Sequence, residues 1–456
     1  MSWLLIIPLM IVCLFLNIRV YLAMFIGIIA YFLFFSSVPI EIAVQRLIAP
    51  TQSPSLLAIP FFILLGTLMS YTGIAERILH IANVLVGKMR GGLGVANILV
   101  STMMGGVSAS NLADAAMLSR MMVPEMERKG YNRAFAAAIT AGGSLVTPII
   151  PPGIALIIYG LVADVSIGKM FIAGLVPGLL CAVVLMFTVY LVARKTNAKP
   201  SRESWPTGKE VVFSLGQAWP ALFLIFAVVG GIRANIFTPT EAGAVAVLIV
   251  LAIGFFIYRE MRISHVVKAL GETARATASV MLVIMASAAL GWIFSMEHAG
   301  VAVANFVTSL TENKYMFLLI INILLLTLGM FLEGNAILLI LVPLLKPVVE
   351  HFGIDPVHFG IIMIFNLSIG AFTPPVGTVM LLVCNITQVS VGNFFKQSLP
   401  PTGGSTVNAN AGDIYPGDFT VPGLIIKTPD EILIRHHYVK TFPSSPRYLP
   451  RPFCAA

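Results

Sequence analysis

The chain has 456 residues, of which 58% are hydrophobic and 11% are charged, and its mean hydropathy is +0.94. Soluble domains carry about a quarter charged residues, so this composition excludes a soluble enzyme or binding domain and indicates an all-α polytopic membrane protein. The net charge of +8 does not indicate nucleic-acid binding, because the basic residues lie in short loops between apolar segments, where the positive-inside rule accounts for them.

The N-terminal part, residues 1–90, is predicted to supply scaffold helices. The first apolar segment is expected to be retained, because no basic region precedes it and no cleavage site follows. The expected elements are spans at 3–15, 21–35 and 56–69, an interfacial amphipathic helix at 40–48 and a surface-lying arm at 74–90. The cysteines form no CxxC pattern, so neither a disulfide framework nor a metal site is predicted.

Residues 91–123 predict a re-entrant helical hairpin. Two apolar arms of about a dozen residues flank the polar turn GGVSASN, whereas about 20 residues are needed to cross a bilayer. Asp114 lies in the return arm. An intramembrane carboxylate there indicates either a functional role or hydrogen bonding across the hairpin.

Two long apolar segments, 134–162 and 358–383, are interrupted at their centres by TPIIPPG and TPPVG. Proline cannot donate to a helix ladder, and backbone freed at mid-membrane must be buried in protein or line a cavity. Such broken helices in the two halves of a chain indicate the binding site of a secondary transporter.

Between them, spans are expected at 170–192, 211–229, 242–257 and 277–294, with a basic loop at 193–209. Thr238 and Glu241 have the spacing of a capping box, so Glu241 is interpreted as a helix start rather than a catalytic group. A second arm at 301–310 and a second hairpin, with arms 317–328 and 336–347, follow. This hairpin turns at Glu333-Gly334-Asn335.

The order of span, arm, hairpin and broken span occurs twice. Segments 66–70 and 291–295, Asn97 and Asn322, and the two Pro-Pro pairs match at an almost constant offset. The first hairpin is flanked by basic loops, which places its base in the cytoplasm, whereas acidic residues near the second place its base outside. The repeats are therefore expected to be inverted, with both hairpin tips near the midplane.

The predicted boundaries are 1–90 for the first scaffold, 91–168 for the first transport elements, 169–313 for the connecting span and second scaffold, and 314–400 for the second transport elements. Residues 401–456 form a polar tail rich in Pro and Gly, expected to be disordered or poorly packed.

At the tips, side-chain and carbonyl oxygens could hold Na⁺, and half-helices that begin at the breaks would hold a substrate carboxylate through their dipoles. No Lys or Arg stands in the middle of either broken span. For any single small residue, such as Gly105 or Ala109, simple helix packing is an equally good interpretation.

These stretches resemble the large, DctM-like membrane subunit of the tripartite ATP-independent periplasmic (TRAP) transporters. The motifs that carry the resemblance are SLLAIPFFILLG (55–66), GGLGVANILVSTMMGGVSASNLADAAML (91–118), PIIPPGI (148–154), FTPTEAGAVA (237–246), GIDPVHFGI (353–361) and TPPVGTVML (373–381). The family's pattern continues beyond residue 400 with a last apolar span, whereas this chain has the polar tail there, which puts its own activity in question.

The resemblance implies a multi-pass protein of the bacterial inner membrane that imports an organic acid with Na⁺, such as a dicarboxylate or a sugar acid of the 2,3-diketogulonate branch. Expected partners are a small four-helix membrane subunit, a periplasmic binding protein and membrane lipid. The implied Na⁺ ligands are Ser108, Ser110, Asn111, Ser144, Thr147, Gly334, Asn335, Thr373, Pro374 and Gly377. The expected substrate contacts are Asn111, Pro151, Pro152, Asn335 and Thr378.

Two alternatives remain on sequence grounds. A passive channel or permease with the same repeats would conduct without Na⁺. An intramembrane enzyme would use a serine of GVSAS with His358 or His298 as base, but no histidine lies deep in a span near Ser108.

Overall fold

The computed structural model describes residues 3–16, 18–36, 38–108, 110–195, 200–202 and 204–398. The chain divides into two units, and all of these residues belong to the first, Met1–Asp418. Within that described part the secondary structure is helical, as the composition predicts. The expectation for the tail at 401–456 lies outside the described residues.

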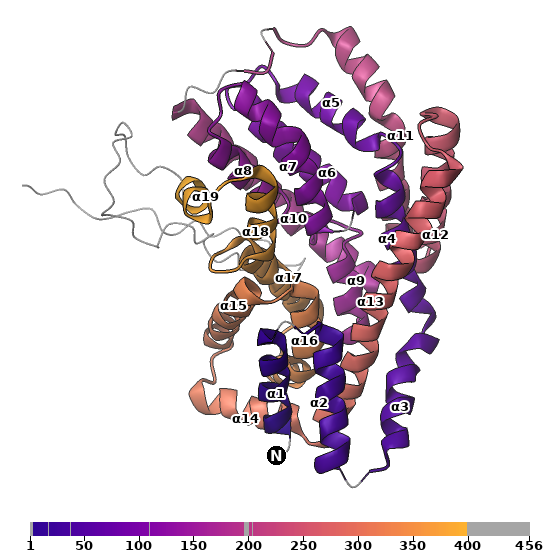
Figure 1. The fold of residues 1–456 in the computed structure, drawn as a ribbon, viewed down its shortest axis with the longest axis vertical. Helices are drawn as coiled ribbons and strands as arrows, with labels where there is room; N and C mark the ends of the chain where they lie inside the picture. The colour runs from indigo at the N-terminus through magenta and orange to yellow at the C-terminus, as the bar shows by residue number, and fades with distance from the viewer. Residues whose placement is uncertain are drawn as a thin grey trace, which may run out of the picture. The chain divides into compact units, whose positions relative to one another are not determined.

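The first scaffold segment agrees with its predicted order. It contains α1 (Trp3–Phe15), α2 (Val20–Phe34), α3 (Ile40–Ile48), α4 (Ala58–Met69) and α5 (Ile74–Val86), with two short 3₁₀ turns between α3 and α4. The α3 and α4 segments form a pair bent by 62°, and Figure 1 shows α3 running below α4 along α13. The interfacial position of α3 stays a prediction.

The first hairpin consists of α6 (Gly92–Ser108) and α7 (Asn111–Arg128), and the first broken helix of α8 (Arg133–Gly143) and α9 (Ile154–Val162). The arms have 17 and 18 residues, so the expectation of about a dozen was wrong. Helical hydrogen bonding does not stop where the apolar run ends, and α7 continues through the polar segment before its cap at Lys129.

The connecting part contains α10 (Ile167–Lys195), α11 (Gly208–Arg233), α12 (Pro239–Ala252), a π-helical turn at Ile253–Ile257 and α13 (Ile263–Met296). The capping box at α12 is confirmed. The Glu241 amide donates to Thr238 Oγ1 at 3.3 Å, and the Thr238 amide donates to Glu241 Oε2 at 2.8 Å. Glu241 therefore begins a helix, as the spacing predicts.

The second repeat ends the described part. It contains α14 (Ala299–Leu310), α15 (Lys314–Phe331), α16 (Gly334–His351), α17 (Pro356–Phe372), α18 (Thr378–Thr387) and α19 (Val391–Ser398). Sequence reasoning did not separate α19, which turns away from α18 by 112°. Six helices of the described part are long and apolar enough to span a bilayer, or eight if each bent pair is one span.

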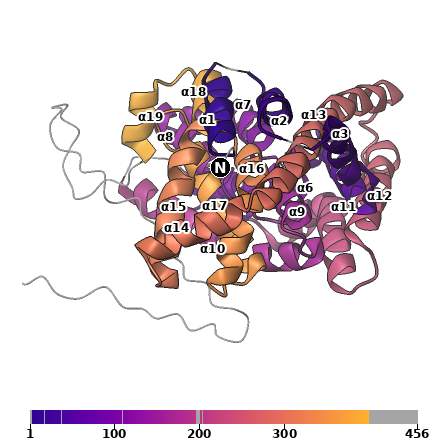
Figure 2. The same cartoon turned by 90° about the horizontal axis from the view of Figure 1, so that it is seen from below.

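The two repeats are inverted within this unit. In Figure 1 the base of the first hairpin, beside α5 and α8, lies in the upper half, whereas α14 and the start of α15 lie at the bottom. Figure 2 shows α15, α16 and α17 next to one another, which is the second hairpin against its broken helix. The chain is thus an all-α polytopic protein with two inverted repeats.

Matching positions of the two repeats make matching contacts. Asn97 on α6 donates to Thr140 Oγ1 on α8 at 2.6 Å, and Asn366 on α17 donates to Asn322 Oδ1 on α15 at 2.5 Å. In both repeats a polar pair therefore joins the first hairpin arm to the first half of the broken helix. This similarity supports the repeat more strongly than the scattered identities in the sequence do.

Replacing either donor should weaken its repeat. Asn97→Leu and Asn366→Leu are each expected to lower the free energy of unfolding by about 0.6–1.7 kcal/mol, as measured for hydrogen bonds between membrane helices. Asn305→Leu, on the exposed surface of α14, is the matched control and should leave it unchanged. Thermal unfolding in detergent measures the effect, and equal midpoints for all three variants would contradict it.

Candidate substrate and cation site

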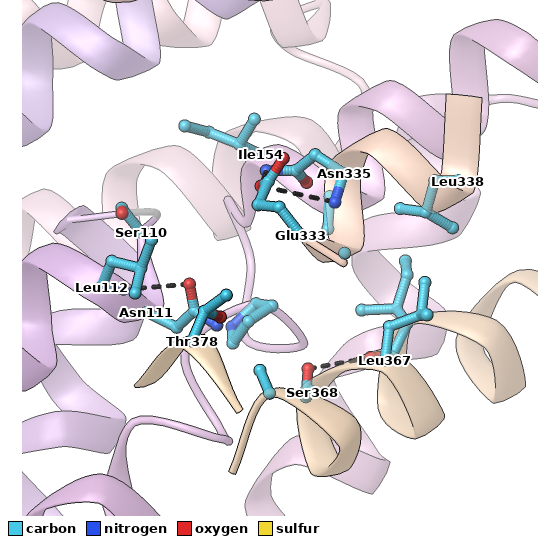
Figure 3. A pocket seen from close by; sticks show the side chains of 15 residues that line it. Ser110, Asn111, Leu112, Ile154, Glu333, Asn335, Leu338, Leu367, Ser368 and Thr378 are labelled. Atoms are coloured by element: carbon cyan, nitrogen blue, oxygen red, sulfur yellow. Dashed lines mark hydrogen bonds between the residues drawn. The ribbon is translucent and has the colours of Figure 1, made fainter. Parts of the chain in front are cut away.

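A cavity of about 90 Å³ lies where the two hairpin tips meet the two broken helices (Figure 3). The first tip contributes Ser110 and Asn111, and the second contributes Glu333, Gly334 and Asn335. The remaining lining residues come from the breaks and the adjoining helices: Leu112, Pro148, Ile154, Ala155, Leu338, Ile364, Leu367, Ser368, Ala371 and Thr378. Elements far apart in the chain thus converge on one polar space.

Four helices begin at this cavity. The first residues of α7, α9, α16 and α18 are Asn111, Ile154, Gly334 and Thr378, and all four line it. The first amides of a helix have no partner within the helix, and its dipole places about half a positive charge at that end. Among the described residues, no Lys or Arg lines the cavity. The positive potential in the cavity therefore comes from backbone.

The first tip is held by caps within its own turn. Ser110 Oγ accepts from the Ala113 amide at 3.4 Å, and Asn111 Oδ1 accepts from the Leu112 amide at 2.9 Å. Figure 3 shows Thr378, at the start of α18, beside Asn111. The side-chain amide and hydroxyl of these two residues come from different repeats, so the site requires both.

The second tip is held by Glu333, which caps α16. Its Oε1 accepts from the Asn335 amide at 3.4 Å and from Asn335 Nδ2 at 2.7 Å (Figure 3). The adjacent break is tied to the same hairpin, because the Gly377 amide donates to the Met330 carbonyl at 2.8 Å. Gly377 has φ +46°, and a Cβ there would lie 2.7 Å from the Thr373 carbonyl oxygen. Glycine fits this turn for both reasons.

A buried carboxylate joins the first hairpin to the first break. Asp114 is 1% exposed, and its Oδ2 accepts from the Ser101 hydroxyl and, at 3.1 Å, from Thr147 Oγ1. Hydrogen bonding across the hairpin, one of the two predicted roles, is therefore present. Oδ1 has no hydrogen-bond partner in the described structure. A buried charge must be paired or neutralised, so this oxygen is available to a cation or a proton.

The structure brings together five of the thirteen predicted site residues. Ser110, Asn111, Gly334, Asn335 and Thr378 line the cavity. The others do not: Ser144, Thr147, Pro151 and Pro152 are buried in the first break, and Thr373, Pro374 and Gly377 form the second. The side chain of Ser108 lies outside the described residues. The role of each as an ion or substrate ligand stays a prediction.

Sequence reasoning missed Ser368 as a site residue. It lies on α17, lines the cavity and donates to the Ile364 carbonyl at 2.8 Å. Its counterpart in the first repeat is Ser144, whose hydroxyl likewise donates to its own helix, at Ala141. Adding the offset between the two repeats to the position of Ser144 would have pointed to Ser368 in the sequence. The sequence places Glu333 in the turn with Asn335, and in the structure it lines the cavity and caps α16.

Inverted repeats, each with a hairpin tip that meets a broken helix at a polar cavity, define a secondary transporter. The sequence profile of the family described as "Tripartite ATP-independent periplasmic transporter, DctM component" matches residues 7–403. The chain belongs to this family. It is a membrane-embedded transporter component and not an enzyme, which removes the intramembrane-enzyme alternative.

Several relatives have printed names that state a substrate. The sialic acid TRAP transporter large permease SiaM of Vibrio cholerae is 38% identical, covering 81% of this chain and 86% of its own length. The C4-dicarboxylate permease DctM of Pseudomonas aeruginosa is 36% identical with the same coverage. The 2,3-diketo-L-gulonate permease YiaN of Escherichia coli is 33% identical, covering 79% and 84%. The relatives with sialic acid and C4-dicarboxylate in their names are at least as similar to this chain, so the comparison does not favour the predicted 2,3-diketogulonate branch over them.

Among solved structures, the YdaH transporter of Alcanivorax borkumensis is similar with a TM-score of 0.54. The alignment covers 80% of this chain and 86% of that one at 16% sequence identity. At this identity the similarity concerns the fold alone, and it agrees with a polytopic transporter architecture.

Proposed function

We propose that the chain is the large permease of a Na⁺-coupled tripartite transporter that imports an organic acid across the bacterial inner membrane. The observation that carries this proposal is the convergence of four helix N-termini on one cavity whose lining residues include no Lys or Arg. Helix N-termini bind carboxylates through free amides and the dipole, so an anion is the fitting cargo.

The oxygen atoms at and near the cavity support coupling to Na⁺. The cavity has hydroxyl, amide and carboxylate oxygens at its wall, and Asp114, in the first turn of α7, has a buried oxygen without a hydrogen-bond partner in the described structure. Oxygen ligands of this kind suit a hard cation. A cation bound beside the helix ends would balance a substrate carboxylate, so the two are expected to bind together.

The partners are proposed from the family and its members. A tripartite system fits a small four-helix membrane subunit and a periplasmic binding protein beside this chain, with lipid around its exposed apolar helices. The relatives' names state sialic acid, C4-dicarboxylate and diketogulonate. All of these are carboxylic acids, which supports an organic acid as the substrate class.

The contact of α13 and α14 with α16 is made of small groups, which supports movement of the hairpins and broken helices against the scaffold. A Cβ on Gly291 would lie 3.3 Å from Pro343 Cβ, and one on Gly300, in α14, would lie 2.6 Å from Pro347 Cγ. Glycines thus face the proline rings of the second hairpin. This surface of small groups offers few side chains that would interlock and resist sliding.

Uptake into proteoliposomes tests the proposal. The chain, with its small subunit and binding protein, should accumulate at least one of sialic acid, succinate and 2,3-diketogulonate when Na⁺ is outside, and about tenfold less when K⁺ replaces it. A chimaera carries the C-terminal end of the Vibrio cholerae permease in place of residues 401–456. If the chimaera takes up substrate and the parent chain does not, the tail is the cause of the inactivity. Uptake that ignores the Na⁺ gradient would instead favour the passive permease.

A further inference from the structure

A second and larger cavity lies between the scaffold and the second hairpin. Its volume is about 550 Å³, compared with about 90 Å³ at the tips. Ser287, Gly291 and Ser295 of α13 form one wall, and Lys346 and Glu350 of α16 face them from the other element. The smaller cavity has the volume of about three waters, so it suits a cation or a carboxylate group. The larger one has room for a whole organic acid.

Lys346 gives this cavity its chemistry. Its side chain is half-buried, and within the described residues it makes no hydrogen bond or ion pair. The neighbour one turn away, Glu350, is exposed and lines the same cavity without pairing with it. A lysine ammonium has three donors and no acceptor. An unpaired ammonium inside a cavity fits an anionic ligand.

The other polar groups are hydroxyls and one carboxylate. Ser287 is buried and its Oγ donates to the Leu339 carbonyl, so it joins α13 to α16 behind the cavity wall. Ser295 is exposed into the cavity and makes no side-chain hydrogen bond in the described part. Glu350 accepts hydrogen bonds from hydroxyl groups but repels a second negative charge. The lining thus offers one site for a carboxylate, at Lys346, and two for hydroxyls, at Ser295 and Glu350.

We propose that this cavity is a staging site for a hydroxylated monocarboxylate, with its carboxylate on Lys346 and its hydroxyls on Ser295 and Glu350. The inference rests on the proposed function and narrows its substrate class to acids of the sugar-acid kind rather than dicarboxylates. The cavity lies toward the base of the second hairpin, the end that loop charge assigns to the outside. The site therefore receives substrate before it reaches the hairpin tips.

Charge-selective labelling tests the role of Lys346. Ser295→Cys, made in the full chain after its four native cysteines are changed to serine, is treated in detergent with an anionic and a cationic methanethiosulfonate. The ratio of anionic to cationic rates should fall about fivefold in Lys346→Met, because a nearby charge is removed. Lys346→Arg should keep the ratio. Lys396→Met, which removes an exposed lysine that does not line the cavity, is the matched control and should also keep it.

Protection against labelling tests the ligand class with named probes. Gluconate should slow the modification of Ser295→Cys, and succinate should slow it much less, because Glu350 opposes its second carboxylate. Glu350→Gln should remove this preference. The proposal would be overturned if the rate ratio were unchanged in Lys346→Met, or if succinate protected as well as gluconate. It would also be overturned if phosphatidylglycerol in nanodiscs protected the cysteine while gluconate did not, because the cavity would then bind lipid. The labelling needs neither Na⁺ nor the partner proteins, so its outcome is independent of the uptake experiment.

Discussion

Asp114→Asn is expected to reduce Na⁺-dependent uptake about tenfold or more, since hydrogen bonds to a charged group are worth about 1.5–3 kcal/mol. Asparagine keeps one oxygen to accept from Ser101 or Thr147. It replaces the carboxylate charge with a neutral amide, whose donors face a place where the native oxygen has no partner. Any cation held there loses its counter-charge, so the concentration of Na⁺ that gives half-maximal uptake should rise.

The matched control is Asp164→Asn. Asp164 is exposed in the turn after α9 and has φ +58°, a conformation that asparagine adopts readily. This variant should keep uptake and its Na⁺ dependence. Asp114→Leu removes the charge and also leaves the Ser101 and Thr147 hydroxyls without their acceptor, so it should lower the thermal midpoint as well as uptake. Comparison with Asp114→Asn then distinguishes loss of the charge from loss of these hydrogen bonds. If Asp114→Asn takes up substrate with unchanged Na⁺ dependence, the carboxylate is structural and the coupling ion binds elsewhere.

The sequence was sufficient to predict which elements converge. Pro148 and Pro374 each begin a short segment with further proline and a glycine, which favours a break in the helix. The polar residues before Asn111 mark the hairpin tip, although α6 continues through them as far as Ser108. The opposite charge of the loops at the two hairpin bases predicted the inversion. These features depend on composition and local backbone chemistry, which a single sequence contains.

The sequence was not sufficient to predict which side chains face the cavity. The first break has ten residues, Ser144 to Gly153, and the second has five, Thr373 to Gly377. The direction of a side chain in such a segment depends on packing against the other repeat rather than on a helical or strand period. Thr147 therefore turns to Asp114, whereas Thr378, at the first position of a new helix, faces the cavity.

Arm length is a second feature that local reasoning missed. The estimate stopped α7 and α16 where their apolar runs end, but both helices continue into polar residues toward the hairpin base. Glu350 lies on this extension of α16, whereas Lys346 lies just before it, within the predicted arm, and both line the larger cavity opposite α13. Only part of the proposed staging site thus lies on the segment that hydropathy did not mark.

Gly370→Ala should strongly destabilise the contact between α15 and α17 in the second repeat. Gly370, on α17, lies against α15 so closely that a Cβ would be 2.7 Å from both Gly329 Cα and the Gly329 carbonyl carbon, and 3.1 Å from the Leu326 carbonyl oxygen. These atoms are backbone and cannot rotate away. The two helices must separate, and overpacking of this kind costs about 1–3 kcal/mol.

The separation of α15 and α17 in Gly370→Ala should also disturb the cavity at the hairpin tips. The second break is attached to α15 through the hydrogen bond from the Gly377 amide to the Met330 carbonyl. Met330 directly follows Gly329, the residue against which Gly370 packs. Moving α15 away lengthens that bond and shifts the start of α18, where Thr378 lines the cavity. Uptake by Gly370→Ala is therefore expected to fall together with stability, even though Gly370 does not line the cavity.

Alanine substitutions at two other glycines, Gly329 and Gly142, provide a graded comparison for the loss of stability in Gly370→Ala. A Cβ on Gly329 would meet its nearest atom, Gly370 Cα, at 3.2 Å, whereas one on Gly142 in α8 would meet nothing within 4 Å. Thermal midpoints in detergent should fall in the order Gly142→Ala, Gly329→Ala, Gly370→Ala, and Gly142→Ala should match or exceed the parent because alanine favours helix. A midpoint for Gly370→Ala equal to that of Gly142→Ala would mean that α15 and α17 are not in backbone contact, and the second tip would then lack its support.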